Sequence, residues 1–480
     1  MQHVLLPFVL HALFLGAGAG VLRVAGFPSL EGMAIVATAG LAYLCGLAVV
    51  LTSTIALLTL GAPLSPWLVA AIASVCTLPA TPQLFRGFLR GIRSDRRRRN
   101  HGARPPSPEQ RVTSLIWVAT TLLLAAAVVM IHSRPVVDWD AWAIWTQKAE
   151  FLYYYPDIPV DVFTSRFYLF FHPDYPILLP MLEALHFGAL GRVDSSEIFV
   201  VLGLLFAAWI AGMKRLADGL LRPTLATPLI LSGAVLLAPG LLSGLADVPV
   251  VLFLSLAALA LGRWVARPNR PELIVAMILL GAAAGTKNEG LSGSLALMVA
   301  ASVALLIGRN RRALRSFGWG AAITLMTAVV PWHVWLSVHH IPTDLPLTAG
   351  LNPVNLLNRA DRVWPALTAV IGSLAHIGTI SVFVPFALAL MCVLWRREPT
   401  LVAFYFTAIA LYVTALVWAY WISPYDLRWH LDHSLPRVSM GVSGLSLAAL
   451  IQLGGAALTP RDTAPASYSR AAPVTTLASS

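Results

Sequence analysis

Charge is scarce in this sequence. Only 11% of the 480 residues are Asp, Glu, Lys or Arg, whereas 58% are hydrophobic. A water-soluble fold of this length cannot bury so much apolar surface, so the composition excludes an ordinary soluble enzyme or binding domain. A helix needs about 20 mostly apolar residues to cross the roughly 30 Å hydrocarbon layer of a membrane. Runs of that kind recur along the chain, and we therefore predict a multi-pass membrane protein.

Cysteine is also rare. The only three, Cys45, Cys76 and Cys392, all fall inside apolar runs, which argues against a disulfide framework and against a thiol metal site. No histidine pair has a helical zinc-binding spacing, so we expect no structural zinc. The glycine-rich run at 16–20 follows no strand, which argues against a dinucleotide-binding loop.

The apolar runs predict an all-α, polytopic transmembrane bundle of about thirteen spans. The first run lacks the basic start and the cleavage site of a signal peptide, so we expect it to be retained as a span. The predicted spans are 4–22, 34–60, 64–85, 114–132, 197–213, 224–240, 247–262, 273–285, 290–308, 316–336, 372–394, 400–421 and 438–458.

Basic residues predict the orientation of the bundle. Alternate connecting segments hold 23 of the 33 Lys and Arg but only six of the 22 acids. Cytoplasmic loops carry such a basic excess, so we place these segments in the cytoplasm and segment 133–197 outside it. Topology alone accounts for the arginine run at 96–99, and we expect no nucleic-acid partner. The basic segments are 86–111, 214–222, 263–272, 309–315, 396–398 and the tail from Arg461.

The same reading divides the chain into three parts. Residues 1–112 are predicted to form N-terminal spans with a basic cytoplasmic loop, and 113–458 to form a transmembrane module with the external loop 133–197. Residues 459–480 are rich in Ala, Ser, Thr and Pro and are predicted to be a disordered cytoplasmic tail. Within the external loop, residues 175–190 predict an amphipathic helix that lies along the membrane interface.

Two carboxylates stand at the start of the external loop. Asp138 and Asp140 flank Trp139 just after a predicted span. Such groups can act as a general base for an acceptor hydroxyl or bind a divalent cation. The alternative is that one of them caps a helix over 141–151. We predict Asp138 and Asp140 as catalytic residues, with no cofactor required for certain and a divalent cation left open.

Three more polar clusters lie on the same predicted side. His172 and Asp174 belong to a proline-containing turn before the interfacial helix. Asp247 heads a later span, where a helix cap is the alternative role. Lys287 and Glu289 lie in a glycine-flanked turn that can bind phosphate or simply form its own ion pair. We predict all five residues as substrate-binding.

A polar loop is predicted over 422–437, near the C-terminus. Arg428 and Arg437 are the residues of this loop that we predict to bind substrate, because guanidinium groups suit an anionic head group.

The order of these motifs resembles that of the GT-C superfamily of membrane glycosyltransferases, particularly the protein O-mannosyltransferases and lipid A aminoarabinose transferases (glycosyltransferase family 39). The acidic pair, the turn at 172–176, the Asp247 helix start and the turn at 286–290 are similar to successive family motifs. Three features depart from the family pattern. Asp174 stands where the family has proline, His172 stands where the family usually has a basic residue, and three extra apolar runs precede the span before the acidic loop.

The resemblance implies inverting transfer of a sugar from a polyprenyl-phosphate donor to a glycan, lipid or protein acceptor. It implies that Asp138 or Asp140 activates the acceptor, while Lys287, His172 and one of the two arginines stabilise the departing lipid phosphate. We expect a bacterial inner membrane protein, surrounded by membrane lipids, whose active site faces the periplasm. The main alternative is a transporter or flippase for a lipid-linked or anionic solute. It is disfavoured because the ionisable clusters gather on one face and no inverted repeat is visible.

Overall fold

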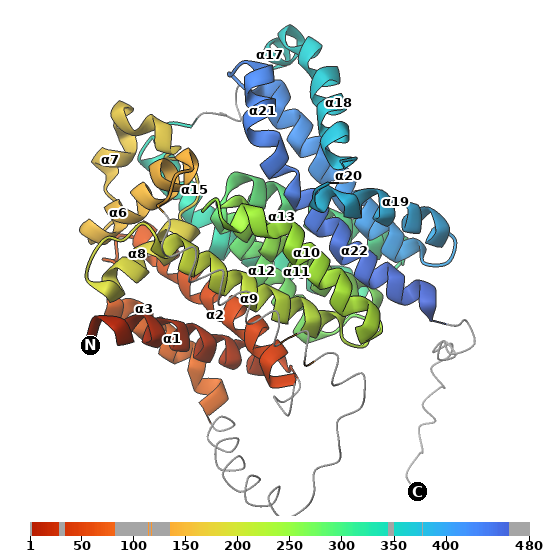
Figure 1. Ribbon diagram of the computed structural model, residues 1–480, viewed down its shortest axis with the longest axis horizontal. Helices are drawn as coiled ribbons and strands as arrows, with labels where there is room; N and C mark the ends of the chain where they lie inside the picture. Colours follow the sequence, from red (N-terminus) through yellow and green to blue (C-terminus); the bar gives the residue numbers. More distant parts are fainter. Residues whose placement is uncertain are drawn as a thin grey trace, which may run out of the picture.

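All regular elements that the structure describes are helices. The structure is a computed structural model, and it describes residues 2–27, 34–81, 114, 117, 135–343, 350–376 and 378–459. Long helices pack side by side through most of the molecule, and shorter ones gather at one end (Figure 1). The predicted all-α bundle is therefore confirmed for these residues.

The N-terminal helices pack closely through small residues. α1 (Gln2–Ala25) lies against α2 (Ala34–Thr59) and the short α3 (Pro66–Thr77), which continues as η1 (Leu78–Ala80). A side chain at Gly18 would collide with the backbone of Ala42, and one at Gly20 would collide with that of Cys76. The glycine-rich run at 16–20 therefore serves close helix packing, as small residues do in membrane bundles.

The centre of the bundle is α11 (Asp247–Ala266). Within an 18-residue apolar stretch of this helix, 94% of the residues are buried, which agrees with a sequence that is apolar on all sides. It packs against α9 (Glu197–Ala217), α12 (Arg270–Thr286), α13 (Asn288–Ile307) and α22 (Met440–Leu458). α10 (Pro223–Leu241) packs on α9. α14 (Arg311–Thr324), the π-helix η4 (Leu325–Val329) and α15 (Val330–Val338) form one continuous helical stretch.

The C-terminal helices complete the bundle and extend beyond it. α20 (Pro399–Ile422) lies along α13, and α19 (Phe383–Leu394) lies along α22. α17 (Pro353–Asn358), α18 (Val363–Leu374) and α21 (Leu427–Val438) rise at the top of Figure 1. The 3-10 turns η5 (Ala360–Arg362) and η6 (Ile380–Val382) precede α18 and α19.

The predicted external loop is built of short helices. They are the π-helix η2 (Asp140–Thr146), α6 (Gln147–Tyr154), α7 (Val160–Thr164), η3 (Arg166–Phe171) and α8 (Leu178–Leu190). The helix predicted over 175–190 is present as α8, but the prediction that this helix is amphipathic is wrong. Most of α8 is buried between α1, α6 and α9, because its residues are apolar on nearly every side.

Nine helices within the described ranges are long and apolar enough to cross a membrane, which is consistent with a multi-pass membrane protein. Three further predicted spans are shorter helices: Pro66–Ala80, Ile380–Leu394 and the 17-residue α12. The prediction of one continuous spanning helix over 372–394 is wrong, because the helix ends at Leu374 and the backbone at His376 and Gly378 is not helical. The span predicted at 114–132 lies outside the described residues, apart from 114 and 117.

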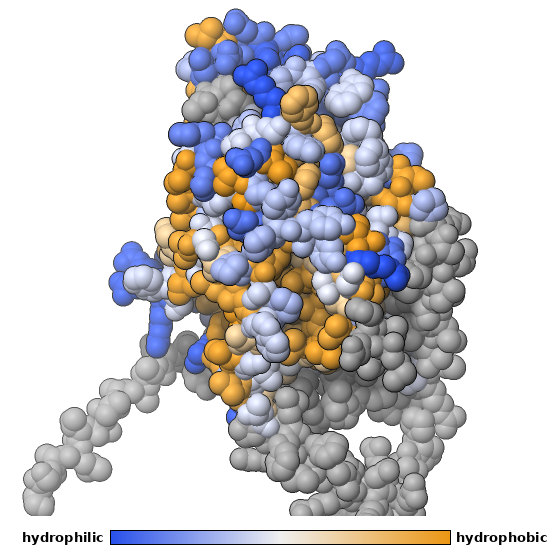
Figure 2. Space-filling view, turned by 90° about the vertical axis from the view of Figure 1, so that its left-hand side faces the viewer, coloured by the Kyte–Doolittle hydropathy of each residue, from blue (hydrophilic) through white to orange (hydrophobic). Residues whose placement is uncertain are grey.

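Charged connections occupy opposite ends of the central helices. At the C-terminal end of α11, Arg263 pairs with Glu272 and donates to the backbone of Leu216 and Asp218. At its other end lies Asp247, near the short helices of the predicted external loop. On the face drawn in Figure 2, the upper end is largely hydrophilic and hydrophobic residues cover much of the middle and lower part. Among the described residues, the Arg263–Glu272 pair and Asp247 are thus separated by the length of α11, about 30 Å.

Candidate functional site

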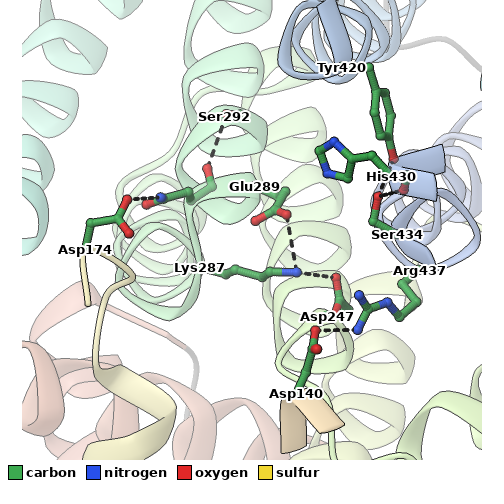
Figure 3. Close-up of polar contacts among 11 residues, drawn as sticks. Asp140, Asp174, Asp247, Lys287, Glu289, Ser292, Tyr420, His430, Ser434 and Arg437 are labelled. Atoms are coloured by element: carbon green, nitrogen blue, oxygen red, sulfur yellow. Dashed lines mark hydrogen bonds and ion pairs between the residues drawn. The ribbon is translucent and has the colours of Figure 1, made fainter. Parts of the chain in front are cut away.

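A buried ion pair stands where α11 begins. Asp247 is the first residue of α11, and Lys287 lies between α12 and α13 in extended conformation, so it interrupts what would otherwise be one helix. This break turns the Lys287 ammonium toward the start of α11, and its Nζ lies 2.8 Å from Asp247 Oδ1 (Figure 3). Each residue is only 4% exposed.

Glu289 is the second partner of this lysine. It lies in the first turn of α13, and its Oε1 is 3.2 Å from Lys287 Nζ. Burial alone favours the neutral amine, but the charges of Asp247 and Glu289 outweigh it and raise the pKa of Lys287 above its usual value. Lys287 is therefore a cation at every physiological pH.

A second ion pair joins residues from opposite halves of the chain. Arg437 on α21 donates from Nη1 to Asp140 Oδ2 at 2.6 Å, and Asp140 is the first residue of η2. Figure 3 shows Arg437 beside Asp247 as well, close enough for the two charges to interact. The two ion pairs thus form one cluster of three carboxylates and two cations, which we call the charge cluster: Asp140, Asp247, Lys287, Glu289 and Arg437.

The charge cluster retains unused hydrogen-bonding capacity. Asp247 Oδ2, Glu289 Oε2 and Arg437 Nε are buried atoms without a hydrogen-bond partner among the described residues. Buried polar atoms are normally satisfied, so exceptions in one cluster are typical of a site that receives water or a ligand. The cluster has the composition needed to bind an anion at its cations and a hydroxyl at its carboxylates.

Asp174 connects the external turn to the Lys287 segment. Its Oδ2 accepts hydrogen bonds from Thr343 Oγ1 at 2.9 Å and from Asn288 Nδ2 at 3.3 Å. Its backbone oxygen accepts from Trp332 Nε1 at 3.0 Å. Asp174 therefore positions the residue that follows Lys287, and its predicted contact with substrate stays a prediction.

Lys148 holds the turn that contains His172, although this lysine was not among the predicted site residues. Its side chain is fully buried, and its Nζ donates to the backbone oxygen of His172 at 2.6 Å. The rings of Trp145, Phe171 and Tyr175 surround the ammonium at 5.4–5.5 Å. A usable signal was present, because Lys148 is one of only three lysines in the chain and stands among aromatic residues.

The His172 turn has a left-handed backbone, with a φ of 51° at His172. The imidazole stacks on Tyr175, with ring centroids 4.8 Å apart. His172 lies close enough to His430 on α21 for their charges to interact, which places it at the edge of the charge cluster.

The predicted polar loop over 422–437 is wrong, because most of it forms α21. Leu427, Leu431 and Leu435 recur every four residues and give the helix an apolar side, which the many charged residues between them obscured. The helical geometry matters for the site. It directs Arg437 toward the other members of the charge cluster and His430 toward the same cluster. Ser434 faces Tyr420, whose OH lies 2.9 Å from Ser434 Oγ.

Besides His172 and Asp174, two further predicted site residues lie outside the charge cluster. Asp138 is exposed and comes two residues before Asp140. Arg428 is exposed and lines a cavity on another side of α21. That cavity has a volume of about 1120 Å³ and lies among α10, α18, η6 and α21. Its walls include Val235, Leu236, Ala369, Ile380, Leu431 and Leu435, and Asp432 and His376 also line it.

The helix-cap alternatives for the carboxylates are not seen. Trp139 is the N-cap of η2 and Ala246 is that of α11, and neither helix has a side-chain cap. Asp140 and Asp247 use their carboxylates for ion pairs instead. Among the residues that the structure describes, no three His, Cys, Asp or Glu side chains are grouped so that they can hold a metal ion. The divalent cation stays a prediction.

The chain matches no family model, no curated protein and no solved structure. The resemblance to GT-C glycosyltransferases therefore rests on the order of short motifs. The charge cluster is therefore the structural feature from which a function is inferred.

Proposed function

We propose that this protein transfers a sugar from a polyprenyl-phosphate donor to a hydroxyl-bearing acceptor, with inversion, at the charge cluster. The observation that carries the proposal is the convergence of two cations and three carboxylates, drawn from η2, α11, the α12–α13 break and α21, at one end of an apolar bundle. Ionisable groups are costly in such surroundings and mark functional sites.

The cations suit the departing phosphate. When the sugar–phosphate bond breaks, negative charge accumulates on the phosphate oxygens, and fixed cations in a site of low dielectric stabilise it strongly. Lys287 is held in place beforehand by Asp247 and Glu289, so little reorganisation is needed. Arg437 is bonded to Asp140, the candidate base, and therefore belongs to the acceptor side of the site. His172 and Arg428 are the more distant candidates for this role.

Asp140 is the candidate base. The acceptor hydroxyl must lose a proton as it attacks the anomeric carbon, and a carboxylate within hydrogen-bond reach can accept it. Asp140 fits this role because it is half-buried and belongs to the cluster, whereas Asp138 is exposed outside it. Inversion follows when base and leaving group act from opposite sides of the sugar in a single displacement.

The cavity beside α21 supports a lipid-linked donor. A polyprenyl chain needs an apolar groove that a membrane-embedded molecule can enter, and apolar residues of α10, α18 and α21 line this cavity.

The proposed location is a bacterial inner membrane, with the charge cluster facing the periplasm. The basic connections at the other end of α11 support this orientation through the excess of Lys and Arg on cytoplasmic sides. The acceptor is a glycan, a lipid or a protein.

The test uses the purified full chain in detergent with labelled polyprenyl-phosphate sugars and a mixture of hydroxyl acceptors. We expect transfer by the wild type and its loss in Lys287→Ala and Asp140→Asn. Asp218→Asn is the matched control, because it removes an ion pair with Lys214 at the other end of the bundle. Absence of turnover by a folded wild type would overturn the proposal, and vesicle uptake of the same lipid would then favour the transporter alternative.

A further inference from the structure

A second buried polar network lies behind η2, apart from the ion pairs of the charge cluster. Its central residue is Glu183 on α8, whose side chain is fully buried. Thr146 Oγ1 donates to Glu183 Oε1 at 2.8 Å, and Thr146 is itself 2% exposed. The other carboxyl oxygen, Oε2, has no hydrogen-bond partner among the described residues.

The charged neighbours of Glu183 are acids. Glu150 on α6 and Glu197 on α9 both act on it electrostatically, and both disfavour a negative charge there. Burial is the largest effect and outweighs the hydrogen bond from Thr146, which favours the ionised form; with the two acids it raises the pKa of Glu183 to about 8. Glu183 therefore carries its proton at neutral pH.

Imidazole groups extend the network toward the N-terminal helices. His186 Nδ1, on the same helix as Glu183, is 3.2 Å from Glu197 Oε2. The ring of His186 lies 4.8 Å from that of His11 on α1, and the hydroxyl of Tyr43 on α2 bonds to His11 Nδ1 at 2.9 Å. Among the described residues, the titratable side chains of this network are Glu150 on α6, Glu197 on α9, His186 on α8, His11 on α1 and Tyr43 on α2.

Thr146 and Asp140 are the two ends of one π-helix. η2 runs over Asp140–Thr146, so Asp140 begins the segment and Thr146 closes it. π-Helices are rare and are frequently found at functional sites. The contact that fixes Thr146 therefore acts on the same seven residues that direct Asp140 toward Arg437.

We propose that Glu183, in its protonated form, is a positioning residue that anchors Thr146, maintains the π-helix and so keeps Asp140 beside Arg437. The proposal rests on the proposed function, since Asp140 is the candidate base. Ionisation of Glu183 places an unpaired negative charge beside Glu150 and Glu197 in a buried site. The segment relieves this cost by moving, and the Asp140–Arg437 pair loosens.

The first test is the pH profile of sugar transfer. We expect wild-type activity to fall at least tenfold between pH 7 and pH 9.5. Glu183→Gln keeps an oxygen that accepts from Thr146 but cannot ionise, so it should lose less than threefold over the same range. Glu150→Gln is the matched control, because it removes an acid that does not contact Thr146. Its transfer activity should still fall between pH 7 and pH 9.5 by most of the wild-type factor. A Glu183→Gln profile equal to that of the wild type would overturn the proposal.

The second test does not depend on activity. Hydrogen–deuterium exchange of segment 140–146 is measured in the full chain at pH 6.5 and pH 9.5, corrected for the intrinsic effect of pH on exchange. We expect protection to fall at least tenfold in the wild type and to persist in Glu183→Gln. Thr146→Val should be deprotected at both pH values, and Thr146→Ser, which keeps the hydroxyl, should behave as the wild type.

The two tests separate failure of this inference from failure of the proposed function. Absence of transfer together with the expected exchange pattern would reject the glycosyltransferase and keep Glu183 as the anchor of η2. Transfer by the wild type together with unchanged exchange at 140–146 would reject the role of Glu183 and keep the enzyme.

Discussion

Lys287 Nζ lies 2.8 Å from Asp247 Oδ1, and both residues are 4% exposed. The pair joins the break between α12 and α13 to the start of α11, so it couples three central helices at one point. A buried pair of this kind is costly to separate. Removing one partner leaves the other as an uncompensated charge in a site of low dielectric.

We expect Lys287→Met to lower the free energy of unfolding by about 3–5 kcal/mol, as for other buried pairs that lose one partner. The double variant Lys287→Met, Asp247→Asn should recover part of that loss, because it neutralises one of the two carboxylates that Lys287→Met leaves without a cation; Glu289 remains. Thermal and denaturant unfolding in detergent measure both effects. Lys214→Met is the control. Its partner Asp218 is 40% exposed, so the change should cost less than about 1 kcal/mol. Equal losses for Lys287→Met and Lys214→Met would contradict this view of the pair.

Asp140→Asn separates the two candidate bases. Loss of a general base typically lowers a rate by about 10²–10⁴-fold, so we expect sugar transfer to fall by at least about 100-fold in Asp140→Asn. Asp138→Asn should keep a rate within about tenfold of the wild type, because Asp138 is outside the ion pairs. The measurement is the initial transfer rate at saturating donor. Full activity in both variants would show that neither residue is the base, and a greater loss in Asp138→Asn would move the role to Asp138.

The helices and all five members of the charge cluster were recognisable from the sequence, for physical reasons. Membrane thickness sets the length of an apolar run, so α2, α9, α11 and α20 stand out without knowledge of their packing. Asp247 and Lys287 were recognisable because ionisable groups are rare beside such runs.

What could not be predicted depends on contacts between distant segments. Arg437 and Asp140 are 297 residues apart, and nothing local in the chain indicates that they meet. Thr146 and Glu183 each look ordinary in sequence, and only packing shows that they bond. Lys148 was overlooked although it is one of only three lysines and stands among aromatic residues in the sequence; that these rings surround its ammonium is a property of the fold. The π-helix η2 was not predicted, because it differs from an α-helix only by one residue in its hydrogen-bond spacing and the sequence pattern does not show this difference.

Lys148→Ala should loosen the turn that carries His172. The substitution removes the donor to the His172 backbone oxygen and the cation among three aromatic rings, so the left-handed turn loses its support. We expect faster cleavage of segment 155–176 by added protease and a loss of sugar transfer of about tenfold or more. The control is Arg192→Ala, which removes a cation from an exposed pair with Asp194 and should change neither property. Unchanged protease sensitivity in Lys148→Ala would contradict a role for this lysine in holding the turn.

Stability should fall with rising pH through the ionisation of Glu183. Burial and the neighbouring acids raise the pKa of Glu183 from 4.5 to about 8 in the folded protein, so the folded state binds more protons than the unfolded state between these values. The contribution of Glu183 to stability is therefore complete below about pH 4.5 and is lost progressively up to about pH 8. The slope is at most about 1.4 kcal/mol per pH unit. Glu183→Gln removes this group from the titration, so its unfolding free energy should depend less on pH from 5 to 8. Denaturant unfolding of both proteins across this range measures the difference, and parallel curves would show that Glu183 is ionised in the folded protein.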